Sequence, residues 1–171
     1  MRIIRFVAML TLLATLALGS VPTLAAGAGA KVTGGGWFLF GGSIPMQFGF
    51  AGVQLPDGSA TGSFHHAYSD SAGNYQFFGT VTCLAFDAAE GRAWIGGVLT
   101  KVISNDPDVG LVAGDDAWFR VLDSPDGDRS TAMGFAGSIP TSEAYCNDRP
   151  WPDDNARTHP VTSGQITVNA R

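Results

Sequence analysis

The sequence predicts an all-β protein, a single-domain antiparallel β-sandwich or flattened barrel of about eight strands with one disulfide. Three observations favour this fold. Helical periodicity is hard to find after residue 31, whereas short apolar runs recur along the rest of the 171-residue chain. Clusters of Gly, Asp, Asn and Pro separate these runs about every ten residues, a spacing typical of an antiparallel meander. The chain also contains 23 glycines, which suit turns and bulges.

Alternating apolar residues define the expected strands, and the segments between them carry turn residues with a physical role. Gly adopts positive φ angles, and Asp and Asn side chains bond to the local backbone. Turns are expected at 56–59, 70–74, 87–91 and 124–128. The expected strands are 32–40, 46–55, 61–68, 75–86, 92–103, 117–123, 130–135 and 165–169.

The strand expected at 75–86 is apolar on both faces, as in the middle of a packed sheet. Strict alternation places Phe77, Val81 and Cys83 on one face and Leu84 and Phe86 on the other. Glycines within strands are expected at bulges, or where a neighbouring aromatic ring lies over the backbone. These glycines are Gly49, Gly79, Gly96 and Gly97.

The charge balance argues against nucleic acid as a partner. The chain has 10 Lys and Arg residues against 15 Asp and Glu residues, and basic residues form no run. Binding to nucleic acid depends on a basic patch that neutralises phosphates. The 45% of apolar residues is enough to form a core, so the chain is not a disordered tail.

The N-terminus has the pattern of a secretory signal peptide, expected at 1–25 with cleavage between 25 and 30. Arg2 and Arg5 precede an uncharged apolar run at 6–18, and small residues follow it. As a helix this run would span about 20 Å, which is too short for a hydrocarbon core of about 30 Å. We therefore expect an exported chain, extracellular or in the cell envelope, without a transmembrane segment in its mature form. A flexible Ala/Gly lead at 26–31 would precede the β domain at 32–171.

Export makes a disulfide the expected state of the two cysteines, Cys83 and Cys146, because exported proteins meet an oxidising environment. Two cysteines allow one pairing. The chain-entropy model gives about 4 kcal/mol of stabilisation for a loop of roughly 60 residues. A metal pair or a catalytic thiol would be the alternatives.

An acidic turn leaves calcium open as a cofactor. Asp123, Asp126 and Asp128 lie within six residues, and Ca²⁺ prefers several oxygen ligands. The spacing is not that of an EF-hand, and an acidic β-turn whose carboxylates cap backbone N–H groups explains the same residues. Two further acidic groups, 105–116 and 148–154, would strengthen the metal hypothesis if they met the first in space.

Enzymatic chemistry has little support in the residues. The chain has no G-x-S-x-G nucleophile motif, and its only glutamates, Glu90 and Glu143, fall in turns or loops. His65 and His66 lie in an expected strand and should point to opposite faces. His66 is expected to be a half-buried packing residue, although its clustering with acids in one pocket would favour a small secreted hydrolase.

Trp151 is the aromatic residue most expected to be exposed. It lies between two prolines in a polar loop, whereas the other tryptophans fall in alternating strands. An exposed indole can stack on a sugar or anchor a partner, and a loop Trp can instead plug the end of a barrel. Trp151 is therefore the expected binding residue.

Several short motifs follow one another along the chain: VTGGG at 32–36, FGF at 48–50, GTVTCL at 79–84, AWIGG at 93–97, VLD at 121–123, GDRS at 127–130, Cys146 and SGQITV at 163–168. Their order resembles a family of largely uncharacterised exported bacterial β-domains, the post-COAP type. The resemblance covers about residues 31 to 169, and departs from the family's pattern at 105–116 and 149–152. It implies a secreted all-β domain and supplies no catalytic residue.

Together these observations predict an exported, non-enzymatic β-domain that binds a partner or associates with the envelope. The partner would be a protein, a glycan or another envelope component. A calcium-stabilised secreted module and a small secreted hydrolase are the alternatives.

Overall fold

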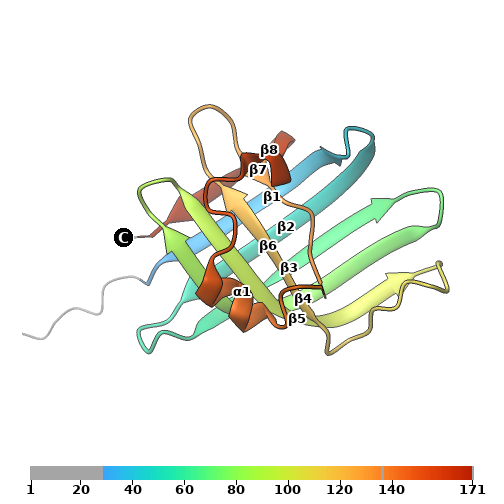
Figure 1. The fold of residues 1–171 in the computed structure, drawn as a ribbon, viewed down its shortest axis with the longest axis horizontal. Helices are drawn as coiled ribbons and strands as arrows, with labels where there is room; N and C mark the ends of the chain where they lie inside the picture. Colours follow the sequence, from blue (N-terminus) through green and yellow to red (C-terminus); the bar gives the residue numbers. More distant parts are fainter. Residues whose placement is uncertain (1–28, 136, 171) are drawn as a thin grey trace, which may run out of the picture.

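A computed structural model describes residues 29–135 and 137–170 as a closed antiparallel barrel of eight strands (Figure 1). Each strand pairs with its neighbours in sequence, and the last strand closes the barrel by pairing with the first. The all-β prediction is confirmed, and of its two forms the barrel is the one that occurs. The strands are β1 (Lys31–Phe40), β2 (Ile44–Gln54), β3 (Ala60–Ser69), β4 (Asn74–Asp87), β5 (Arg92–Ser104), β6 (Asp116–Leu122), β7 (Arg129–Ser130) and β8 (His159–Asn169).

The first six strands lie within two residues of their predicted bounds, and the last two do not. The strand expected at 130–135 was wrong in length, because β7 contains only Arg129–Ser130. Beyond it the chain returns to β6 through a single bridge between Gly134 and Trp118. The strand expected at 165–169 is the second half of β8, which begins at His159.

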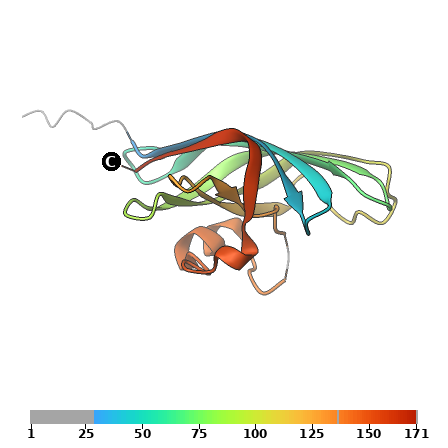
Figure 2. The same cartoon turned by 90° about the horizontal axis from the view of Figure 1, so that it is seen from above.

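Two short helices were not predicted. The helix α1 (Ser142–Asp148) begins at Thr141, whose hydroxyl accepts the N–H of Ala144 at 3.1 Å. The 3₁₀ helix η1 (Asn155–Arg157) begins at Asp154, whose carboxylate accepts the N–H of Ala156. The part of the β7–β8 connection that contains α1 lies on one side of the barrel (Figure 2). None of the helices in the described part of the chain is long and apolar enough to span a membrane.

Aromatic rings fill the barrel interior, and glycines make room for them. Phe48, Phe64 and Phe119 are buried inside the barrel. A Cβ at Gly79 would overlap the ring of Phe64, and one at Gly97 would lie 2.8 Å from the same ring. The prediction that aromatic rings lie over strand glycines is therefore confirmed at these two positions.

A β-bulge reverses the faces of β4 halfway along the strand. Val81 pairs with Gly97 and Cys83 with Gly96, so Thr82 is the extra residue. Val81 therefore faces the interior while Cys83 faces outward, and the predicted placement of both on one face was wrong. The reversal is what turns Cys83 towards α1.

The disulfide between Cys83 and Cys146 is confirmed, and it fixes α1 to the outside of the barrel. Cys146 belongs to a second buried cluster on the outer face of β4–β6, with Trp94, Trp118 and Tyr145. The indole N–H of Trp94 donates to the carbonyl of Pro150 at 3.0 Å. This outer cluster holds the segment that carries Trp151. The signal peptide expected at 1–25 lies outside the described residues.

Candidate binding cleft

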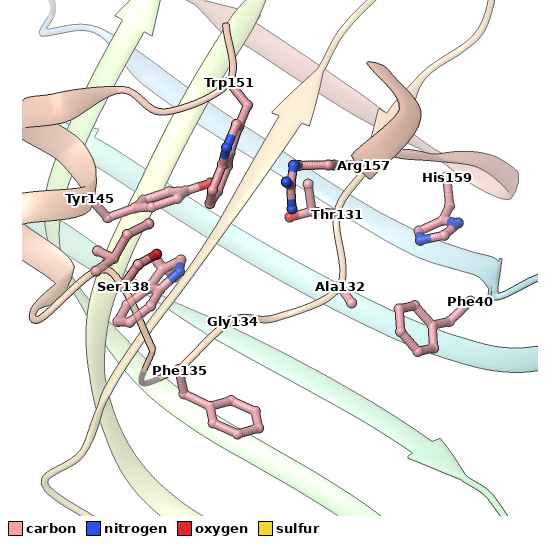
Figure 3. A pocket seen from close by; sticks show the side chains of 12 residues that line it. Phe40, Thr131, Ala132, Gly134, Phe135, Ser138, Tyr145, Trp151, Arg157 and His159 are labelled. Atoms are coloured by element: carbon pink, nitrogen blue, oxygen red, sulfur yellow. The ribbon is translucent and has the colours of Figure 1, made fainter. Parts of the chain in front are cut away.

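Trp151 lies on a strained turn directly after α1. Its φ is 55°, and that of Arg149 is 45°, so two residues with side chains occupy the left-handed region. Such conformations cost of the order of 1–3 kcal/mol and persist only where the surroundings hold them. The N–H of Arg149 donates to Tyr145 at the end of α1, and Asp154 donates its N–H to the carbonyl of Trp151. The turn thus fixes the position of the indole beside Tyr145 (Figure 3).

Arg157 holds the indole in place. Its guanidinium carbon lies 4.3 Å from the centroid of the Trp151 ring, which is a favourable cation–π distance. Its Nε donates to Oδ2 of Asp154 at 2.9 Å. The other carboxylate oxygen of Asp154 accepts the N–H of Ala156 at the start of η1. Within the described residues the terminal Nη groups of Arg157 make no hydrogen bond.

These residues form one edge of a cleft of about 280 Å³ on the outer face of the barrel, which we call the Trp151 cleft. In Figure 3 the side chains of Trp151, Tyr145 and Arg157 lie near one another, and those of Phe40 and His159 lie at the opposite end. The cleft is lined by Phe40, Trp118, Thr131, Ala132, Gly134, Phe135, Ser138, Ile139, Tyr145, Trp151, Arg157 and His159.

The aromatic rings of the cleft are packed against one another rather than loose. Trp118 and Tyr145 stack with their ring centroids 5.8 Å apart. Gly134 pairs with Trp118 through two backbone hydrogen bonds, and a Cβ at Gly134 would lie 2.6 Å from the indole nitrogen. At the other end, His159 stacks on Phe38 at 5.3 Å. These rings are therefore fixed by packing, whereas those of Trp151, Phe40 and Phe135 are exposed.

Burial keeps the titratable rings of the cleft uncharged. It raises the pKa of Tyr145 well above its usual value, although the nearby Arg120 opposes this. Burial also lowers the pKa of His159, helped by the positive charge of Arg129. Near neutral pH the charged groups at the cleft are thus Arg157 and its partner Asp154. A neutral, polar ligand with an apolar face fits this environment.

The structure gives two of the three predicted calcium ligands another partner. Oδ2 of Asp123 accepts the N–H of Val168 at 2.9 Å, and Oδ2 of Asp128 accepts the N–H of Ile166 at 2.6 Å. Asp126 is exposed on the turn between them. Among residues 29–135 and 137–170, no three or more Asp, Glu, His or Cys side chains are grouped to hold a metal ion.

The acidic loops do not converge. Asp106 lies in the β5–β6 connection, where its carboxylate accepts the hydroxyl of Tyr75 at 2.6 Å. Asp123 follows the opposite end of β6, so the length of that strand separates the two loops. Asn155, next to Asp154, lines a pocket with Asp123 and Asp126, but the carboxylate of Asp154 itself bonds to Arg157 and to the N–H of Ala156. The arrangement that would have strengthened the metal hypothesis is therefore not present in the described residues.

His65 and His66 point to opposite faces of β3, as predicted. His66 is more buried than expected, with 1% of its surface exposed, and it lies inside the barrel. The cavity that it lines contains one acidic residue, Asp70, whose Oδ1 accepts the N–H groups of Ala72 and Gly73. His66 is thus not clustered with several acids among the described lining residues, and no Ser, Thr or Cys is among them.

Sequence reasoning identified Trp151 but missed the residues around it. Trp118, Tyr145 and Arg157 lie on three different elements, and the disulfide and α1 bring them together. The one local signal for the contact between Trp151 and Arg157 was their spacing in the sequence. It can be recognised only when Asp154 is known to begin the helical turn η1. Comparisons with models of protein families, with curated proteins and with solved structures gave no match to this chain.

Proposed function

We propose that the chain is an exported, non-enzymatic domain that binds a saccharide of the cell envelope in the Trp151 cleft. The observation that carries this proposal is the indole of Trp151, which is 36% exposed at the rim of a concave aromatic surface and held by Arg157. Sugar rings present an apolar face that packs on an indole and hydroxyl groups that bond to a guanidinium. The size of the cleft suits a ligand of about one ring.

Export is part of the same proposal. The disulfide agrees with an oxidising compartment, because such bonds are rare in the cytosol. The signal-like sequence at 1–25 and the resemblance to the post-COAP β-domains support the same location. Mass spectrometry of the protein recovered from the envelope or the medium should give an N-terminus between residues 26 and 31. A mature protein that begins at residue 1 would contradict export by cleavage.

Saccharide binding is tested with two probes, insoluble peptidoglycan and soluble oligosaccharides of N-acetylglucosamine. Trp151→Ala should weaken binding at least tenfold without changing the melting temperature by more than a few degrees. Trp37→Ala is the matched control, because Trp37 is equally exposed, at 37%, but lies on β1 outside the cleft. It should bind like the wild type.

Two results would overturn the proposal. One is the absence of binding to either probe by the wild-type protein. The other is equal binding by the wild type and by Trp151→Ala, since the cleft would then not be the site.

A further inference from the structure

The mouth of the barrel contains a second cavity, which adjoins the Trp151 cleft and has a volume of about 200 Å³. It lies at the barrel end where β1 meets β2 and β3 meets β4. Met46, Phe77 and His66 are its buried lining residues, while Phe40 and Phe135 are exposed and form its rim. The two spaces meet at three residues that line both, Phe40, Ala132 and Phe135.

His66 is the feature that packing does not explain. Its ring lies 4.8 Å from that of Phe119 and 6.3 Å from that of Phe48, so aromatic carbon surrounds it. Neither Nδ1 nor Nε2 has a hydrogen-bond partner among the described residues. A buried polar group without a partner costs about 1–3 kcal/mol, so a packing residue at this position would more economically be Phe or Leu. His66 also lines the cavity, so its two unpaired nitrogens are the buried polar atoms nearest to a ligand there.

The chemistry of the cavity defines what this ligand is. The walls are mostly aromatic and aliphatic, and the one acidic group is Asp70 at the rim. Since neither Lys nor Arg is among the described lining residues, a buried anion would have no positive partner. Burial lowers the pKa of His66 to about 3, with a smaller effect from His65, so the imidazole is neutral and offers one N–H donor and one acceptor nitrogen. A hydroxyl group can pair with either nitrogen.

We infer that the barrel mouth is a second binding site, which takes a small neutral ring compound with a hydroxyl group that hydrogen-bonds to His66. A cavity of about 150 Å³ lined by apolar groups binds benzene, so about 200 Å³ holds a ring with one polar substituent. This site goes beyond saccharide binding on the outer face, although the two share the lining residues Phe40, Ala132 and Phe135.

The test compares phenol with toluene, which has a similar ring but no hydroxyl group. Binding to the full mature chain is followed by the melting temperature and by the ¹⁵N shifts of the histidine rings. Phenol should raise the melting temperature and shift the His66 ring nitrogens of the wild type. His66→Phe keeps a ring of similar size without nitrogens, and it should lower the affinity for phenol relative to toluene about tenfold.

Two controls separate this site from the cleft and from simple hydration. Trp151→Ala should lose saccharide binding and keep phenol binding, so the two proposals succeed or fail separately. His65→Gln, on the opposite face of β3, should bind phenol like the wild type. The inference is overturned if phenol leaves the His66 nitrogen shifts of the wild type unchanged, which would mean that water alone fills the cavity. It is also overturned if His66→Phe keeps the full preference for phenol.

Discussion

The carboxylate of Asp128, just before β7, accepts the backbone N–H of Ile166 in β8, with 2.6 Å between oxygen and nitrogen. Backbone pairing between β7 and β8 ends after two residue pairs, Arg129 with Pro160 and Ser130 with His159. Further along β8 the side chains of Asp128 and Asp123 take the place of a neighbouring strand. The acidic turn that suggested calcium therefore satisfies the free edge of β8.

Asp128→Ala should lower the free energy of unfolding by about 1.5–3 kcal/mol, because it leaves the N–H of the buried Ile166 without a charged acceptor. Asp126→Ala, two residues away and exposed, should change it by less than about 0.5 kcal/mol. Urea unfolding measures both, in EDTA and again in calcium chloride. The same loss in both buffers is expected. A calcium-dependent rise in the wild-type midpoint that Asp126→Ala removes would support the calcium hypothesis instead.

The disulfide should account for about 4 kcal/mol of the free energy of unfolding, since it closes a loop across a sequence separation of 63 residues. In the double variant Cys83→Ser and Cys146→Ser, α1 loses its covalent attachment to β4. We expect the far-UV circular dichroism of the barrel to persist, while the near-UV signal of Trp94 and Trp118 weakens. Urea unfolding gives the energy, and the wild type treated with reductant is the control. A double variant as stable as the wild type would contradict this role.

Gly79→Ala should destabilise the barrel by about 1–3 kcal/mol, because the added Cβ overlaps the ring of Phe64. The cost should fall when Phe64→Leu is combined with it, so that the two changes are not additive. Gly35→Ala is the matched control, since its nearest neighbour in another residue is a carbonyl oxygen 3.5 Å away. Additive losses in the double variant would mean that the backbone, and not the ring, sets the requirement for glycine.

The fold was predictable because its determinants are local. Turn residues about ten positions apart and two-residue alternation give six of the eight strands. The inward and outward faces of β4 were not predictable, because the bulge at Thr82 adds one residue and alternation alone cannot detect it. The pairing of Cys83 with Cys146 was predicted from composition, yet which side of the barrel it would cover depended on that bulge.

The Trp151 cleft was less predictable, because its parts meet only through tertiary structure. Trp151 was identified from its two neighbouring prolines, a local feature. Trp118 fits the alternation of its strand, so nothing in the sequence set it apart from a core residue. Tyr145 lies in a helix of seven residues, which is too short to show a helical period. His66 was predicted to pack, and nothing local to it indicated a cavity.

The burial of His66 should make the protein less stable in mild acid. Its pKa is about 3 in the folded state and near 6.5 when unfolded, so the unfolded chain binds the proton first. Stability therefore falls as the pH drops below about 6.5 and continues to fall towards pH 3. Between pH 7 and pH 5 this single group should remove about 2 kcal/mol from the free energy of unfolding.

The comparison of variants isolates this effect from the carboxylates and from His159, whose pKa is also lowered. Urea unfolding at pH 7 and pH 5 gives the acid-induced loss for each protein. For His66→Phe the loss should be about 2 kcal/mol smaller than for the wild type, whereas His65→Gln, on the half-exposed outer side of β3, should keep the full loss. An equal loss in His66→Phe and the wild type would show that His66 gains its proton without unfolding, and that the imidazole is not held neutral inside the barrel.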